Sequence, residues 1–185
     1  MKKLFSWILP LVLVCFVSCR HSNEPIVNPI PDTITNPDEI YTSYRDCLSD
    51  FYKNIYSITY IRENHNKQQY GVFEYSHNTN TNEESNETNF YSSVSLIGDG
   101  NKTMIKIMLS GHHFANTGIT EEKGDISIVM HGDEEVAFAA ETSIIHSGDK
   151  LYLKDFKTQA YICVLQKDQG LIFLTDNRGH TWDAQ

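Results

Sequence analysis

The chain has few positively charged residues and no cluster of them. Its 185 residues include 15 lysines and arginines against 24 aspartates and glutamates, which gives a formal net charge of −9 at pH 7. Nucleic acids and anionic lipid surfaces are bound mainly by concentrated positive charge. The composition therefore argues against both as partners, and we expect no nucleic-acid partner.

Recognisable catalytic motifs are also missing. The sequence contains no Gly-x-Ser-x-Gly, no phosphate-binding loop and no dinucleotide fingerprint. Ser147 and Lys150 have the Ser-x-x-Lys spacing of penicillin-binding enzymes, but that motif opens a helix, whereas Gly148 and Asp149 predict a turn. The sequence assigns no catalytic residue, and we expect no cofactor.

The histidines and carboxylates lack the spacing of metal ligands. His112 and His113 are adjacent, so on a strand they would point to opposite faces. An acidic segment surrounds one expected strand without a regular spacing of oxygen ligands, and we interpret it as a solvated rim. Its residues are Glu121, Glu122, Asp125, Asp133, Glu134 and Glu135. We therefore expect no metal site.

No apolar run is long enough for a comfortable membrane span. The stretch from Leu4 to Val17 is apolar apart from Ser6, but a spanning helix needs roughly 20 apolar residues. Lys2 and Lys3 precede this stretch, and a polar run follows Cys19. A basic start, a short apolar core and a small residue before the cut predict a secretory signal peptide over residues 1–18.

The end of this leader, Phe16-Val17-Ser18-Cys19, resembles the lipobox of bacterial lipoproteins, although that family usually has Leu where Phe16 stands. The resemblance implies cleavage before Cys19 and acyl chains on its sulfur and amino group, and several chains together anchor a protein durably. Arg20 is not the Asp that resembles an inner-membrane retention signal, so we expect a lipid-anchored envelope protein at the outer membrane. The alternative is ordinary secretion with a chance cysteine.

Residues 19–36 are expected to form an extended tether. Pro25, Pro29 and Pro31 lie among polar residues without apolar periodicity. Asp32-Thr33-Ile34 resembles the short O-glycosylation motif of Bacteroides-type bacteria. The tether would hold a single domain, residues 37–185, away from the bilayer.

The mature chain would retain only two cysteines besides Cys19. Cys47 and Cys163 could pair as a disulfide, because exported compartments are oxidising. Alternatively, both could be buried thiols. The sequence leaves the two alternatives open.

The domain is expected to begin with a helix that ends near Asn54. Asn36 is a suitable N-cap, and Pro37 is suited to the first helical position. Apolar residues then recur at spacings of three and four, which predicts one buried stripe. The stripe consists of Ile40, Tyr44, Cys47, Leu48 and Phe51.

The remainder predicts an antiparallel meander of mainly β class, α+β at the margin. Alternating apolar residues separated by Gly- and Asp-rich turns are typical of hairpins. Residues 77–89, in contrast, contain no apolar residue and predict an exposed loop. A sandwich, a small barrel and a cystatin-like sheet around a helix all fit; we favour a barrel-like or strongly bent sheet with the helix across one opening or face. The expected strands cover residues 55–61, 70–75, 90–97, 103–109, 126–130, 136–140, 151–156, 161–165 and 171–175.

The C-terminal stretch resembles the Asp-box hairpin of sialidases and other propellers. The matching residues are Thr175, Asn177, Gly179, Thr181 and Trp182. In those families the motif is structural: a short polar side chain bonds the turn, glycine allows positive φ and tryptophan packs beneath. One copy in a chain of this length predicts a hairpin, not a propeller.

These observations favour a lipid-anchored, non-enzymatic envelope module that binds a glycan or a protein. One alternative is a small envelope hydrolase that uses dispersed carboxylates or His112. Another is an inhibitor or immunity-type lipoprotein that acts through the expected loop at residues 77–89.

Overall fold

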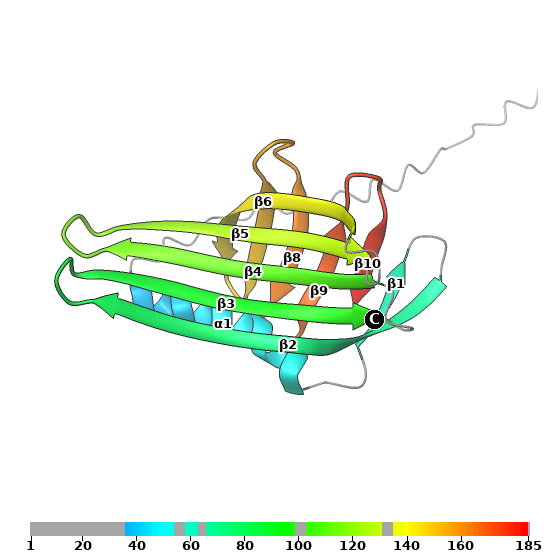
Figure 1. The fold of residues 1–185 in the computed structure, drawn as a ribbon, viewed down its shortest axis with the longest axis horizontal. Helices are drawn as coiled ribbons and strands as arrows, with labels where there is room; N and C mark the ends of the chain where they lie inside the picture. Colours follow the sequence, from blue (N-terminus) through cyan, green and yellow to red (C-terminus); the bar gives the residue numbers. More distant parts are fainter. Residues whose placement is uncertain (1–35, 54–57, 63–65, 99–102, 131–134, 185) are drawn as a thin grey trace, which may run out of the picture.

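A computed structural model describes residues 36–53, 58–62, 66–98, 103–130 and 135–184. The expected signal peptide, Cys19 and the tether as far as residue 35 lie outside the described residues. In the described part, helix α1 (Pro37–Lys53) precedes a series of strands (Figure 1). They are β1 (Ile58–Arg62), β2 (Asn66–Asn82), β3 (Glu87–Gly98), β4 (Thr103–Phe114), β5 (Ile119–Met130), β6 (Glu135–Ser147), β7 (Lys150–Asp155), β8 (Tyr161–Gln166), β9 (Gly170–Thr175) and β10 (Thr181–Ala184).

The strands form a closed antiparallel barrel. From β2 to β10 each strand pairs with the next one in the chain, and β1 pairs with both β2 and β10. The closing contact places Tyr60 opposite Ala184. The expected mainly β fold, antiparallel meander and N-terminal helix are confirmed, and of the three arrangements that the sequence left open the chain adopts the barrel.

Helix α1 begins and packs as its sequence requires. The Asn36 side-chain oxygen accepts a hydrogen bond from the Asp38 backbone N–H at 3.0 Å, which satisfies one donor of the first turn. Ile40, Tyr44 and Leu48 are completely buried. The helix contacts β2, β3 and β4 on one side of the ring and β8 and β9 on the other. No helix in the described ranges is long and apolar enough to span a membrane.

Alternating side-chain directions give the long strands an inward and an outward face. On β4, Ile105, Ile107 and Leu109 are completely buried, whereas Lys106 between them is exposed. These inward residues join the helix stripe in one hydrophobic core. Each such side chain contributes about 1.5–3 kcal/mol on burial, so the inward face fixes the strand register.

The expected loop at residues 77–89 was wrong. These residues extend β2 and β3 into a long hairpin that stays paired as far as Asn82 opposite Glu87. Thr81 and Thr88 share a hydroxyl hydrogen bond of 3.2 Å across the pair. This part of the hairpin, which we call the arm (residues 77–89), projects beyond the core (Figure 1), and its residues are mostly exposed. A strand without a buried face has no apolar alternation, and this is why its composition resembled a loop.

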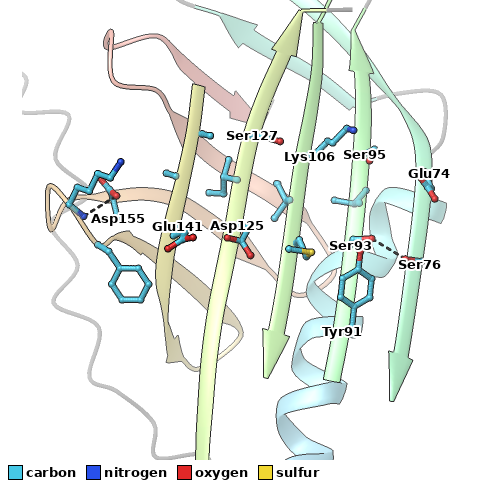
Figure 2. A pocket seen from close by; sticks show the side chains of 18 residues that line it. Glu74, Ser76, Tyr91, Ser93, Ser95, Lys106, Asp125, Ser127, Glu141 and Asp155 are labelled. Carbon is cyan, nitrogen blue, oxygen red and sulfur yellow. Dashed lines mark hydrogen bonds between the residues drawn. The ribbon is translucent and has the colours of Figure 1, made fainter. Parts of the chain in front are cut away.

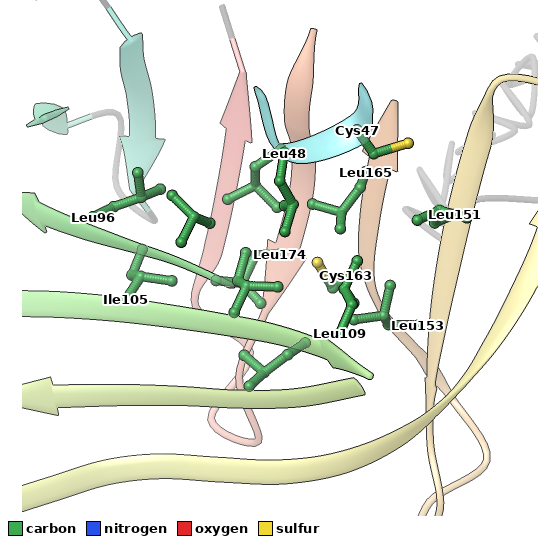
Figure 3. Close-up of a cluster of buried hydrophobic side chains, with 14 of the residues drawn as sticks. Cys47, Leu48, Leu96, Ile105, Leu109, Leu151, Leu153, Cys163, Leu165 and Leu174 are labelled. Carbon is green, nitrogen blue, oxygen red and sulfur yellow. The ribbon is translucent and has the colours of Figure 1, made fainter. Parts of the chain in front are cut away.

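Cys47 and Cys163 are buried thiols and are not joined in a disulfide. Both lie in the hydrophobic core (Figure 3), where the Cys47 sulfur points away from Cys163. Cys47 donates a weak hydrogen bond to the Asp149 carbonyl at 3.9 Å. Burial raises the pKa of the Cys163 thiol far above its ordinary value. The second alternative therefore describes this structure: the cysteines act as small apolar core residues.

Candidate binding groove

The outward faces of five neighbouring strands form the floor of a groove of about 830 Å³. The strand register aligns outward residues of β2 to β6 in two cross-strand rows. The first row contains Ser76, Ser93, Met108, Asp125 and Glu141. The second row contains Glu74, Ser95, Lys106, Ser127 and Ala139. Most of these side chains are short, so the face is hollow where longer side chains would fill it.

The turn between β7 and β8 forms one wall of the groove (Figure 2). The backbone N–H of Phe156 donates to the Glu141 carbonyl at 3.1 Å, which ties this turn to β6. Two partly exposed aromatic rings, Phe156 at 50 % and Tyr91 at 36 %, also line the groove. Aromatic faces beside short hydroxyl side chains give the groove both apolar and polar contact surfaces.

The carboxylate of Asp155 holds this wall in shape. It accepts hydrogen bonds from the Lys157 and Thr158 backbone N–H groups, both at 3.1 Å, and from the Thr158 hydroxyl at 2.7 Å. The Thr158 hydroxyl bond, with help from the backbone bonds, lowers the Asp155 pKa although burial opposes this. Asp155 therefore remains ionised, and its oxygens are engaged within the turn.

The histidines weighed in the sequence lie away from the groove. His112 Nε2 lies 3.4 Å from Glu87 Oε2, and its ring stacks on Phe114 with centroids 4.1 Å apart. His113 Nδ1 lies 2.9 Å from the Thr120 hydroxyl. Ser147 and Lys150 flank a turn in which Gly148 has φ +57°. In the described part of the chain, no three His, Cys, Asp or Glu side chains gather where they could hold a metal ion.

Comparison with known proteins adds no relative. No family model, curated protein or solved structure matches the chain.

A polar cluster of Tyr44, Glu122 and His146 lies inside the barrel and joins α1 to β5 and β6. The Tyr44 hydroxyl donates a short hydrogen bond to Glu122, and His146 Nε2 lies 2.7 Å from Glu122 Oε1. The rings of Tyr44 and His146 are stacked, with centroids 6.1 Å apart. Burial, reinforced by the Glu122 carboxylate, raises the Tyr44 pKa well above its ordinary value. The phenol therefore stays protonated and acts as a donor.

The interpretation of Glu122 as part of a solvated rim was wrong. Its side chain is only 18 % exposed, because it shares the inward face of β5 with the buried Gly124 and Ile126. The neighbouring Glu121 points outward and is exposed. Composition alone groups Glu121 and Glu122 in one acidic segment. Neighbouring residues of a strand point to opposite faces, and this separates the two side chains in the structure.

The Asp-box-like residues form the hairpin between β9 and β10, but with a different turn residue. Asp176, not the exposed Asn177, bonds the turn: its carboxylate accepts from the Arg178 and His180 backbone N–H groups, both at 2.9 Å. His180 Nδ1 adds a 2.7 Å contact. Gly179 has φ +80°. In the flanking strands, Thr175 lies opposite Thr181, and Trp182 is buried and donates to the Tyr70 hydroxyl at 3.1 Å.

Replacing Asp176 with asparagine should destabilise the protein at neutral pH and have little effect in acid. Burial alone would raise the Asp176 pKa, but the hydrogen bonds from His180 and Arg178 outweigh it and lower the pKa. A lowered carboxyl pKa stabilises the fold above the unfolded value of about 3.9, and this is lost as pH falls through the folded value. Melting temperatures of the wild type and Asp176→Asn should converge with falling pH. Asn177→Ser is the control, and a constant difference would contradict the assignment.

Proposed function

We propose that the chain is a lipid-anchored module of the bacterial cell envelope that binds a glycan or protein component in the groove over β2–β6. The observation that carries the proposal is the groove itself, a hollow of about 830 Å³ with a floor of short polar side chains and exposed aromatic rings in its lining. The expected leader of residues 1–18, followed by Cys19, supports the location at the envelope by its resemblance to a lipobox.

The chemistry of the lining favours binding. Ser76 and Ser93 hydrogen-bond to one another at 3.0 Å, so these hydroxyls face a hydroxyl and not a general base. Hydroxyls, carboxylates and aromatic faces together suit a ligand with many hydroxyl groups, because each polar group of the ligand finds a partner. A glycan meets this description.

Filling the groove tests the proposal. Ser127 lies in the second row, between Lys106 and Ala139, so Ser127→Trp should occupy the space of the ligand and weaken binding by about tenfold or more. Purified protein would be measured by calorimetry against a panel of envelope polysaccharides and envelope proteins. The matched control is Thr117→Trp, which places the same ring at the exposed turn between β4 and β5.

The wild type and the Thr117→Trp control should bind the same member of the panel equally well. Binding by Ser127→Trp at wild-type strength would place the ligand elsewhere on the surface. No binding to any member by the wild type would reject the proposed function.

A further inference from the structure

The groove carries charges of both signs in separate rows. Asp125 and Glu141 lie directly opposite across β5 and β6, and Figure 2 shows their carboxylates facing one another in the groove. Like charges directly opposite on a sheet destabilise it. A positively charged group bound beside this pair on the groove floor would relieve the repulsion.

Lys123 supplies positive charge to one member of this acidic pair. Lys123 Nζ lies 3.4 Å from Asp125 Oδ2, and the Lys123 side chain is 54 % exposed. The Lys123 ammonium group therefore contacts Asp125 of the acidic pair, in an exposed ion pair that a ligand could displace at little cost. Within the described residues, Glu141 forms no ion pair. Asp155 is close by, but its carboxylate is engaged in the turn.

Positive charge lies in the adjoining row. Lys106 stands between Ser95 and Ser127 on the neighbouring strands, is exposed, and forms no ion pair with any described residue. Figure 2 shows its amino group pointing away from Asp125 and Glu141. The two rows are two residues apart along the strands, which is about 7 Å. The remaining charged lining residues are Glu74 on β2 and Lys157 in the wall.

We propose that the groove recognises a zwitterionic glycan, one that carries free ammonium and carboxylate groups on neighbouring sugars. The ammonium would lie between Asp125 and Glu141 in place of Lys123. The carboxylate would lie on Lys106, with the hydroxyls of Ser95 and Ser127 as further donors. This inference rests on the proposed function and specifies the ligand class of the same groove.

Three probes of similar length separate the two charges. N-deacetylated heparosan alternates glucosamine and glucuronic acid and carries both charges; heparosan keeps the carboxylates alone, and a chitosan oligosaccharide carries ammonium groups alone. We expect the zwitterionic probe to bind the full-length protein at least about tenfold more tightly than either single-charge probe. Equal binding of all three, or strongest binding of a single-charge probe, would overturn the inference.

Charge-removing variants assign each half of the site. Lys106→Gln should make the zwitterionic probe bind no better than chitosan. Glu141→Gln should make it bind no better than heparosan, and the same change should raise the melting temperature, because it relieves the repulsion with Asp125. An unchanged preference in both variants contradicts the charge assignment. Glu121→Gln, an exposed carboxylate outside the groove, is the control.

This experiment and the groove-filling test fail in different ways. If Ser127→Trp abolishes binding to a member of the envelope panel but the zwitterionic probe is not preferred, the binding groove stands and its charge selectivity is rejected. If the probes bind equally to wild type and Ser127→Trp, their attraction is non-specific and the inference is rejected. A poly-lysine peptide that outcompetes every glycan would assign the groove to a basic protein partner instead.

Discussion

Glu122→Ala is expected to destabilise the fold by about 2–5 kcal/mol. Glu122 is the shared acceptor for the Tyr44 hydroxyl and His146 Nε2. Both donors are buried, so its removal leaves two buried polar groups without their protein partner. His146 Nδ1 already has no hydrogen-bond partner among the described residues, so the imidazole would lose its remaining one.

Urea denaturation measures this loss, and Glu121→Ala is the matched control. Glu121 is the preceding residue on the same strand but points outward, so its removal should change the free energy of unfolding by less than about 0.5 kcal/mol. The triple variant Tyr44→Phe, Glu122→Leu, His146→Leu should recover much of the stability, because it removes donors and acceptor together. Identical midpoints for Glu122→Ala and the wild type would show that the cluster does not hold α1.

Cys19→Ser is expected to move the protein from the membrane fraction to the soluble fraction. Serine cannot form the thioether, so the variant would lack the acyl chains, each of which contributes about 0.8 kcal/mol per buried CH₂ group. Cell fractionation and intact-protein mass spectrometry measure the two consequences, loss of sedimentation and loss of lipid mass.

Cys15→Ser is the control for this experiment, because Cys15 lies within the expected leader and would be removed with it. This variant should fractionate and weigh the same as the wild type. A Cys19→Ser protein that still sediments with membranes at unchanged mass would remove the lipid anchor from the proposal. The proposed binding groove does not depend on the lipid anchor and would still be tested by Ser127→Trp.

The helix and most strands were predictable because their signals are local. The stripe from Ile40 to Leu48 and the alternation of Ile105, Ile107 and Leu109 each report a buried face. Barrel closure was not predictable in this way, because the pairing of β1 with β10 depends on segments far apart in the sequence. The arm at residues 77–89 was missed because neither of its faces is part of the core.

The groove was missed for a different reason. Its floor consists of outward residues such as Ser93, Ser95 and Ser127, which look like ordinary solvated positions in isolation. Only the register places Ser95 beside Lys106 and Asp125 beside Glu141. Short side chains at alternate outward positions of consecutive strands are the signal of this groove in the sequence.

The order in which the strands are made has a consequence for biogenesis. The ring closes when β1, from the beginning of the domain, pairs with β10, Ile61 lying opposite Asp183. Strand β10 is made after the other strands of the ring, so the ring cannot close before β10 has left the ribosome, and such a distant pairing is slow to form. For the export that we propose, a late closure would be favourable, because a channel that admits only unfolded chains excludes a closed barrel.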